Sequence, residues 1–310
     1  MQIVILDSYV TNPGDISWDS ISALGELTLY DRTSDDMVIE RSKNAEIVLV
    51  NKTVITPDHI KALPKLQLIC IMATGMDNVA VDFAKSKGIE VKNAKGYSTQ
   101  AVAQHVFALI LELTNHVGLH NQSVQDLEWT HNTDWCYWKK GLTELSDKTI
   151  GIYGLGEIGK AVIRIAESFG MNIAVTSGHA RAEDYPNWQL VLLDELFAIS
   201  DIVSLHAPLS NKNEGIVNSR LLEKMKPGSL LINTGRGGLI VNNDLRKALL
   251  DHHLAGAAMD VLSSEPPEEK HPLLGIDNCI LTPHIAWAAK ESRLRLVKIV
   301  ENNISTFLKN

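Results

Sequence analysis

The stretch TIGIYGLGEIGKAVIRIAESFG (residues 149–170) places an apolar strand pattern, a glycine-rich turn and a helical pattern one after another. Its glycines, Gly154-x-Gly156-x-x-Gly159, have the spacing that allows a tight turn, close approach of a pyrophosphate and close packing of helix on strand. The amino terminus of the helix adds unpaired N–H groups and a partial positive charge. These features predict a dinucleotide-binding turn; the alternative is a glycine-rich loop that serves packing alone.

Short apolar runs alternate with helical patterns on both sides of this stretch. Strands are predicted at residues 3–7, 45–50, 66–72, 89–93, 149–153, 172–176, 201–206, 229–234, 255–261 and 279–283. A long helix is expected over about residues 99–119 and a last helix over 287–308. Uninterrupted apolar strands that alternate with helices indicate parallel sheets covered on both faces. We therefore predict an α/β fold with two doubly wound, Rossmann-like or flavodoxin-like domains and a cleft between them.

The composition excludes several classes of protein. A length of 310 residues suits two domains, and a net charge of −8 argues against binding to nucleic acid or to an anionic membrane. Three widely separated cysteines fit neither a disulfide framework nor a metal site, and they favour a reducing compartment. The N-terminus lacks a basic region, and no apolar stretch reaches the roughly 20 residues of a membrane span. We expect a cytoplasmic protein that uses no metal.

Charged side chains follow three of the later predicted strands. Arg236 lies in NTGRGG, Asp260 and Glu265 lie in MDVLSSEPP, and His284 lies in LTPHIAW. Ligands of open α/β sheets bind outside the carboxyl ends of the strands, so these groups are expected near a bound nicotinamide. An arginine can hold a carboxylate and polarise the adjacent ketone, and an imidazolium oriented by a carboxylate can donate a proton. Each residue alone would fit a surface loop, but together they predict a site that reduces a carbonyl group.

These motifs resemble the D-isomer-specific 2-hydroxyacid dehydrogenases along nearly the whole chain. The matching stretches are GLGEIGKAV, DIVSLHAPL, MKPGSLLINTGRGGLI, GAAMDVLSSEPP and NCILTPHIAWA. The resemblance implies that Arg236 binds a 2-oxo acid, that His284 is the acid/base with Glu265 as its partner, and that Asp260 faces the nicotinamide carboxamide. It also implies a substrate-binding domain of residues 1–98 plus 285–310 and a dinucleotide-binding domain of residues 99–284.

Four further stretches are similar to the hydroxypyruvate reductase or glycerate dehydrogenase branch: NKT (51–53), MATGMDNVAVD (72–82), DWCYW (134–138) and PHIAW (283–287). The branch implies reduction of a small 2-oxo acid such as hydroxypyruvate or glyoxylate, whose carboxylate meets backbone N–H groups of Thr74, Gly75 and Met76. Lys52 either lines the cleft or is a solvated side chain. Trp138 is a candidate substrate contact, because it aligns with a tryptophan that related reductases insert across a dimer interface; the alternative is that it packs under its own loop. The resemblance implies a homodimer.

The expected cofactor contacts follow the predicted strands: Gly154, Gly156, Glu157, Ile158, Ser177, His179, Arg181, His206, Ala207, Pro208, Thr234, Gly235 and Asp260. In TSGHAR (176–181), Ser177 stands where NAD-using members of the fold carry an acidic residue that binds the ribose hydroxyls. A hydroxyl can donate to a 2′-phosphate, and His179 and Arg181 can add positive charge. NADP(H) is therefore expected to be preferred, with NAD(H) as a second cofactor. The alternative is a plain polar turn that tolerates NAD.

Two other interpretations stay open. A dinucleotide-sensing corepressor on the same fold would carry the same motifs, and oxidation of a reduced nicotinamide on addition of hydroxypyruvate separates it from an enzyme. A dehydrogenase for bulkier 2-keto acids would keep the same carboxylate and ketone contacts. Initial rates with a panel of 2-oxo acids separate that enzyme from a hydroxypyruvate reductase.

Overall fold

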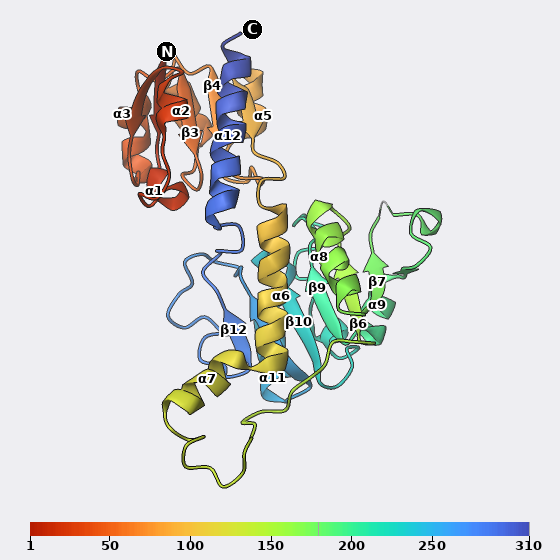
Figure 1. The fold of residues 1–310 in the computed structure, drawn as a ribbon. Helices are drawn as coiled ribbons and strands as arrows, with labels where there is room; N and C mark the ends of the chain where they lie inside the picture. The colour runs from red at the N-terminus through yellow and green to blue at the C-terminus, as the bar shows by residue number, and fades with distance from the viewer. Residues whose placement is uncertain (179, 310) are drawn as a thin grey trace. The chain divides into compact units, whose positions relative to one another are not determined.

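The computed structural model describes residues 1–178 and 180–309, and the backbone divides into two compact units. The first unit is formed by Met1–Ser98 with Trp287–Asn310, and the second by Thr99–Ala286. Each unit is built around one parallel β-sheet flanked by helices (Figure 1). The α/β class with two parallel sheets, predicted from the alternation of apolar strands and helices, is confirmed.

The first unit contains a five-stranded sheet in the order β2-β1-β3-β4-β5. Its strands are β1 Gln2–Ile5, β2 Glu26–Leu29, β3 Ile47–Val50, β4 Leu68–Ile71 and β5 Glu90–Asn93. Its α-helices are α1 Ser8–Thr11, α2 Asp19–Ser22, α3 Val38–Ser42, α4 Pro57–Lys61, α5 Val81–Ser86 and α12 Lys290–Phe307. Strands β3 and β4 are buried along their whole length, which is why they were predicted. Strand β2 was missed because it lies at the sheet edge with mostly exposed residues.

The second unit contains a seven-stranded parallel sheet in the order β12-β11-β10-β9-β6-β7-β8. Its strands are β6 Thr149–Tyr153, β7 Asn172–Thr176, β8 Gln189–Leu190, β9 Ile202–Leu205, β10 Ser229–Asn233, β11 Leu254–Met259 and β12 Cys279–Leu281. Helices α8 Glu157–Ser168, α9 Leu193–Ile199, α10 Ser219–Leu222 and α11 Asn242–Leu250 connect them. The strand order reverses between β6 and β9, and ligands of open α/β sheets bind at such a switch point.

The single long helix predicted over residues 99–119 is in fact two helices. Helix α6 spans Thr99–Asn115 and helix α7 spans Val117–Gln125, with His116 between them in a left-handed conformation at φ 49°. The prediction was wrong because Val117 and Leu119 continue the apolar pattern past the break, although both side chains are exposed.

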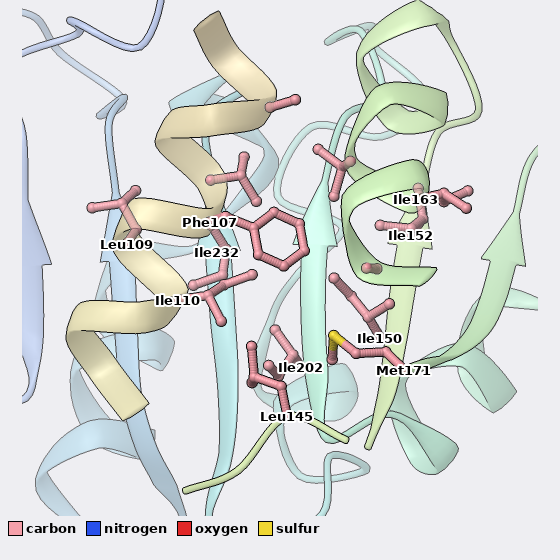
Figure 2. Close-up of a cluster of buried hydrophobic side chains, with 14 of the residues drawn as sticks. Phe107, Leu109, Ile110, Leu145, Ile150, Ile152, Ile163, Met171, Ile202 and Ile232 are labelled. Atoms are coloured by element: carbon pink, nitrogen blue, oxygen red, sulfur yellow. The ribbon is translucent and has the colours of Figure 1, made fainter. Parts of the chain in front are cut away.

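Helix α6 packs on the second sheet through a buried cluster of apolar side chains (Figure 2). Phe107 and Ile110 of α6 lie in this cluster with Ile150 of β6 and Ile232 of β10. Burial of each such side chain contributes roughly 1.5–3 kcal/mol. This packing fixes the position of α6, and therefore of the polar residues it carries, such as His105. Across residues 1–178 and 180–309, none of the helices is long and apolar enough to cross a bilayer.

Candidate active site

The predicted site residues of the second unit lie just after the ends of parallel strands: Gly154 after β6, Ser177 after β7, His206 after β9, Thr234 to Arg236 after β10, Asp260 after β11 and His284 after β12. Because all seven strands are parallel, these segments lie at the same end of the strands. We call this end of the sheet, where the strands finish, the carboxyl edge. The fold therefore gathers polar groups that are up to 130 residues apart, from Gly154 to His284, along one side of the unit.

The glycine-rich turn packs against the segment after β9 at the switch point. Gly154 adopts φ 103°, and a Cβ placed on it would lie 2.5 Å from the backbone nitrogen of Ala207. Only glycine satisfies both constraints. Gly156 directly precedes α8, and a Cβ there would meet nothing within 4 Å. The first N–H groups of α8, which begins with Glu157 and Ile158, have no acceptor within the helix, so the turn fits a pyrophosphate.

Two further groups near the switch point bear on cofactor binding. Thr234 keeps a buried Oγ1 that has no hydrogen-bond partner within the described chain. His206 has Nε2 at 2.9 Å from Oγ of the buried Ser204, and burial lowers the pKa of His206 to about 4. Its ring is therefore neutral at pH 7, so it can hydrogen-bond to a cofactor without adding charge. Of the two residues that follow His206, Ala207 is buried and Pro208 is exposed.

The Arg236 loop is fixed by the side chain of Asn233, the last residue of β10. Asn233 is fully buried; its Oδ1 accepts the N–H of Gly235 at 3.0 Å, and its Nδ2 donates to the carbonyl of Arg236 at 2.9 Å. A Cβ on Gly237 would lie 1.9 Å from the carbonyl carbon of Leu262, so glycine lets this loop pack against the segment that leads to the next site residue. Sequence reasoning missed Asn233, although it opens the quoted NTGRGG stretch.

Glu265 and His284 are hydrogen bonded, with Oε2 of Glu265 at 2.5 Å from Nδ1 of His284. The other carboxylate oxygen, Oε1, accepts the backbone N–H of Leu262 at 3.0 Å, which orients the group. An ionised carboxylate can only accept, so Nδ1 of His284 carries a proton. The opposite nitrogen, Nε2, is then the one that can hold or release a proton toward a ligand. The imidazole is 27% exposed, which leaves it accessible from solvent.

The backbone of His284 adopts a left-handed conformation at φ 54°, which residues other than glycine rarely adopt. Its nitrogen lies 2.9 Å from the carbonyl oxygens of both Asp260 and Thr282. The carboxylate of Asp260 is 1% exposed and accepts the N–H groups of Ile285 and Ala286 at 2.9 Å each. These bonds offset a conformational cost of roughly 1–2 kcal/mol. The visible role of Asp260 is to hold this loop, and its expected contact with the nicotinamide carboxamide stays a prediction.

The turn after β7 is polar and open. Ser177 is half-buried, Gly178 is exposed, and a Cβ on Gly178 would meet nothing within 4 Å. The side chain of Arg181 is 78% exposed and lies 3.6 Å from that of Glu183. Such an exposed ion pair contributes little stability, so an incoming phosphate can replace it. His179, the other expected cation of this turn, lies outside the described residues.

In the first unit, a buried carboxylate holds the loop that carries Lys52. Asp7 is 5% exposed; its Oδ1 accepts the N–H of Asn51 at 2.8 Å, and its Oδ2 accepts those of Lys52 and Thr53 at 2.6 and 2.7 Å. Three backbone donors on one carboxylate fix the course of the loop, while Lys52 itself is exposed. Sequence reasoning missed Asp7, although an acidic residue at the end of the buried stretch IVILD was its signal.

The neighbouring loop, Thr74 to Met76, follows β4. Because β3 and β4 are parallel, it lies at the same end of the five-stranded sheet as the loop that carries Lys52. Oγ1 of Thr74 donates to the carbonyl of Ala94 at 2.9 Å, and the carbonyl of Thr74 accepts Nδ2 of Asn93 at 2.7 Å. Thr74 and Met76 are exposed, and Gly75 is half-buried. The loop is thus anchored to β5 while its outer residues stay accessible.

Trp138 lies on an arm, residues 126–141, that follows α7. The arm is tied internally, because Nε1 of Trp129 donates to the carbonyl of Trp135 at 2.9 Å. It is also tied to α7, because the N–H of Lys139 donates to Nε2 of His120 at 3.0 Å. Trp135 and Trp138 are nevertheless 86% and 67% exposed.

The arm returns to the sheet at the edge opposite the carboxyl edge. Lys140 and Gly141 line a cavity of about 910 Å³ together with Ile202 and Ser229, the first residues of β9 and β10. Trp138 is therefore not brought together with the Arg236 and His284 loops of its own chain.

Potential metal ligands and cysteine thiols both occur among the described residues. Within residues 1–178 and 180–309, no group of three or more His, Cys, Asp or Glu side chains could hold a metal ion. Burial raises the pKa of Cys70 and of Cys279 to about 12, so both thiols stay protonated at neutral pH.

Comparison with known proteins gives a consistent family. The family model described as "D-isomer specific 2-hydroxyacid dehydrogenase, NAD binding domain" matches residues 107–286. A protein named hydroxypyruvate reductase from Blautia hydrogenotrophica is 46% identical over 100% of this chain and 97% of its own length. A glycerate dehydrogenase from Methylorubrum extorquens is 34% identical over 90% of this chain and 88% of its own.

Among solved structures, an acyclic imino acid reductase in complex with NADPH and D-Arg has a TM-score of 0.87 and 31% sequence identity. The match covers 100% of this chain and 97% of that one. The similarity thus extends through both compact units of the chain, beyond the nucleotide-binding part that the family model matches.

Proposed function

The chain belongs to the D-isomer specific 2-hydroxyacid dehydrogenase family and is an NAD(P)-dependent dehydrogenase of the hydroxypyruvate reductase type, and on this premise we propose that it reduces hydroxypyruvate or glyoxylate to the D-2-hydroxy acid. The observation that carries the proposal is the 2.5 Å contact between Glu265 and His284, with the Arg236 loop packed against the segment before Glu265. The similarity to proteins named hydroxypyruvate reductase and glycerate dehydrogenase favours an enzyme over the corepressor interpretation.

His284 is the proposed proton donor. A reduced nicotinamide bound at the carboxyl edge would supply the hydride, and the segments around Gly156 and Thr234 would hold it there. As the carbonyl carbon gains the hydride, negative charge develops on the substrate oxygen. A proton on Nε2 of His284 neutralises that charge, while Glu265 holds Nδ1 and keeps the ring oriented. In the reverse direction, the same nitrogen removes the hydroxyl proton.

Arg236 is the proposed substrate anchor. A guanidinium can bind a carboxylate through two parallel hydrogen bonds and can polarise the adjacent ketone, which few other side chains do together. In the first unit, Lys52 and the backbone of Thr74, Gly75 and Met76 stay the proposed additional contacts of the substrate carboxylate. Their loops are fixed and their outer residues are accessible, as binding requires.

The proposal is tested by initial rates with a panel of 2-oxo acids. We expect hydroxypyruvate and glyoxylate to give higher kcat/KM values than 2-oxo acids with bulky side chains. A preference for the bulky acids would contradict the proposed substrate class but not the reaction. Because the structural relative named above is an imino acid reductase, the panel includes 2-oxo acids with ammonia or amines. Faster turnover of the resulting imines than of hydroxypyruvate would overturn the proposal.

We further propose that NADPH is the preferred cofactor. Residues Thr176, Ser177 and Gly178 offer no carboxylate to repel a 2′-phosphate, and Arg181 is exposed beside them. A hydrogen bond to a charged group is worth about 1.5–3 kcal/mol, so Arg181→Ala should weaken NADPH binding about 10- to 100-fold. NADH binding should hardly change, and Ser177→Asp should favour NADH. Cofactor affinities are measured by fluorescence titration.

The matched control for this prediction is Glu183→Gln, which removes the partner that competes for Arg181. It should leave NADPH affinity unchanged or slightly higher. Equal catalytic efficiency of the wild-type protein with NADPH and NADH, or a preference for NADH, would contradict the proposed selectivity.

We also propose that the protein is a homodimer in which the arm, residues 126–141, contacts the second copy. Trp135 and Trp138 expose large apolar side chains that a monomer would leave in water. Because Trp138 is remote from the Arg236 loop of its own chain, a contact with substrate requires the site of the partner. Light scattering at micromolar concentration should give twice the 34.2 kDa of one chain. A particle of one chain mass would show that the arm has another role.

A further inference from the structure

A polar chain of three side chains lies behind the loop that carries His284. Oγ1 of Thr282 donates to Oδ1 of Asp260 at 2.6 Å, and Nε2 of His105 lies 3.1 Å from the same Oγ1. His105 belongs to α6, Thr282 follows β12, and Asp260 follows β11. All three residues are in the second unit. Their hydrogen bonds therefore connect α6, the longest helix of that unit, to the ends of two strands.

The direction of these hydrogen bonds follows from counting protons. The hydroxyl of Thr282 has one proton, and the carboxylate of Asp260 can only accept. That proton is therefore donated to Asp260, and Oγ1 is left to accept from Nε2–H of His105. The same nitrogen lies 3.5 Å from Oδ1 of Asp260, so its proton is directed toward both acceptors. Hydrogen bonds aligned in one direction polarise and strengthen one another.

Asp260 connects these side chains to the loop that carries His284. Its two oxygens accept the N–H groups of Ile285 and Ala286, and its carbonyl accepts the N–H of His284. These bonds hold His284 at φ 54°, a conformation that the surrounding structure must impose. If the carboxylate rotates, the left-handed turn relaxes, and Nε2 of His284 moves relative to the substrate oxygen.

We propose that Thr282 and His105 are positioning residues for the acid/base His284, acting through the carboxylate of Asp260. The proposal rests on the proposed function, because it concerns the step in which His284 transfers a proton. Neither side chain needs to touch substrate or cofactor. Their contribution is to fix the orientation of a buried carboxylate that would otherwise be held by two backbone N–H groups alone.

The test compares two substitutions at position 282. Thr282→Val keeps the shape of the side chain but removes the hydroxyl, whereas Thr282→Ser keeps the hydroxyl. In single-turnover experiments with enzyme-bound NADPH and saturating hydroxypyruvate, Thr282→Val should slow hydride transfer about 10- to 100-fold, the cost of misplacing a catalytic group by up to about 1 Å. Thr282→Ser should retain most of the rate. The KM for hydroxypyruvate should change little, because Arg236 is untouched.

The rate constant and the amplitude of the single-turnover reaction together separate a positioning role from a merely structural role. Loss of folded protein lowers the amplitude, because fewer molecules react, but leaves the rate constant unchanged. Misplacement of His284 lowers the rate constant and leaves the amplitude unchanged. A wild-type rate constant in Thr282→Val therefore overturns the proposal, whatever the amplitude. Absence of any transient in the wild-type protein with hydroxypyruvate or glyoxylate would instead count against the proposed function.

A double-mutant cycle tests whether His105 acts through Thr282. His105→Leu removes the donor, and His105→Gln keeps an N–H group at about the position of Nε2. His105→Leu should slow hydride transfer, and His105→Gln should restore part of the rate. Combined with Thr282→Val, His105→Leu should add almost nothing further, because residues in one hydrogen-bonded chain are not additive. Fully multiplicative effects of the two substitutions would show that His105 acts independently, and the proposal would fail.

Discussion

Replacement of His284 by alanine should lower kcat for hydroxypyruvate reduction by about 10²- to 10⁴-fold, the usual contribution of a positioned proton donor. The variant loses both the Nε2 proton donor and the partner of Glu265, which lies 2.5 Å from Nδ1. NADPH binding should persist, because the glycine turn and the start of α8 are unchanged. Steady-state kinetics and a cofactor titration on the same preparation measure both quantities.

A matched histidine substitution serves as the control. His252 also has a left-handed backbone, at φ 53°, but it lines the cavity at the edge opposite the carboxyl edge. His252→Asn should leave kcat unchanged, since asparagine tolerates this conformation. Near-normal turnover of His284→Ala at saturating hydroxypyruvate would disprove the proposed proton donor. An equal loss in His252→Asn would mean that the effect is not local.

The sequence predicted most accurately two strands that have a buried centre and less buried ends. Strand β7 has the predicted bounds, Asn172–Thr176, and β6 has Thr149–Tyr153, because central strands of a parallel sheet are continuous apolar runs. Strand β2 was missed because three of its four residues are exposed, and β8 was missed because it has only two residues. The break at His116 was missed because an apolar period does not report a single left-handed residue.

The same limit applies to the site. The residues at strand ends could be predicted, because a parallel sheet brings the residues that follow its strands to one edge. The residues that hold them could not be predicted, because their roles depend on contacts between distant positions. His105 and Thr282 are 177 positions apart, and Asp7 binds backbone N–H groups more than 40 positions away. No local pattern contains such pairs.

Trp138 illustrates a second reason why the role of a residue could not be predicted from the sequence. Its sequence context suggested a substrate contact, yet the arm leads away from the carboxyl edge of its own chain, and its indole is 67% exposed. In the proposed homodimer, the contacts of such a residue are made by the second copy, and no pattern within one chain contains them. The light-scattering experiment therefore has to precede any interpretation of a Trp138 variant.

Arg236→Ala should lower kcat by about 10²- to 10³-fold, the typical loss when one group that stabilises developing charge is removed. It should also raise the KM for hydroxypyruvate, because the same guanidinium is proposed to bind the substrate carboxylate. The variant keeps the two hydrogen bonds between the side chain of Asn233 and the backbone of Gly235 and of residue 236, so the loop should keep its course. It loses the hydrogen bond from Nη1 of Arg236 to the carbonyl of Gly235, which belongs to the guanidinium itself.

Arg236→Lys tests which property of the guanidinium matters. Lysine keeps the positive charge but cannot form two parallel hydrogen bonds with a carboxylate, so kcat should recover more than KM. Arg220→Ala is the control, because that arginine is exposed and pairs with Asp194 at 2.6 Å on the protein surface, where an ion pair contributes little. It should leave both constants unchanged. If Arg236→Lys restored KM fully while kcat stayed at the level of Arg236→Ala, simple charge would suffice for binding, and the proposed two-bond grip on the substrate carboxylate would be wrong.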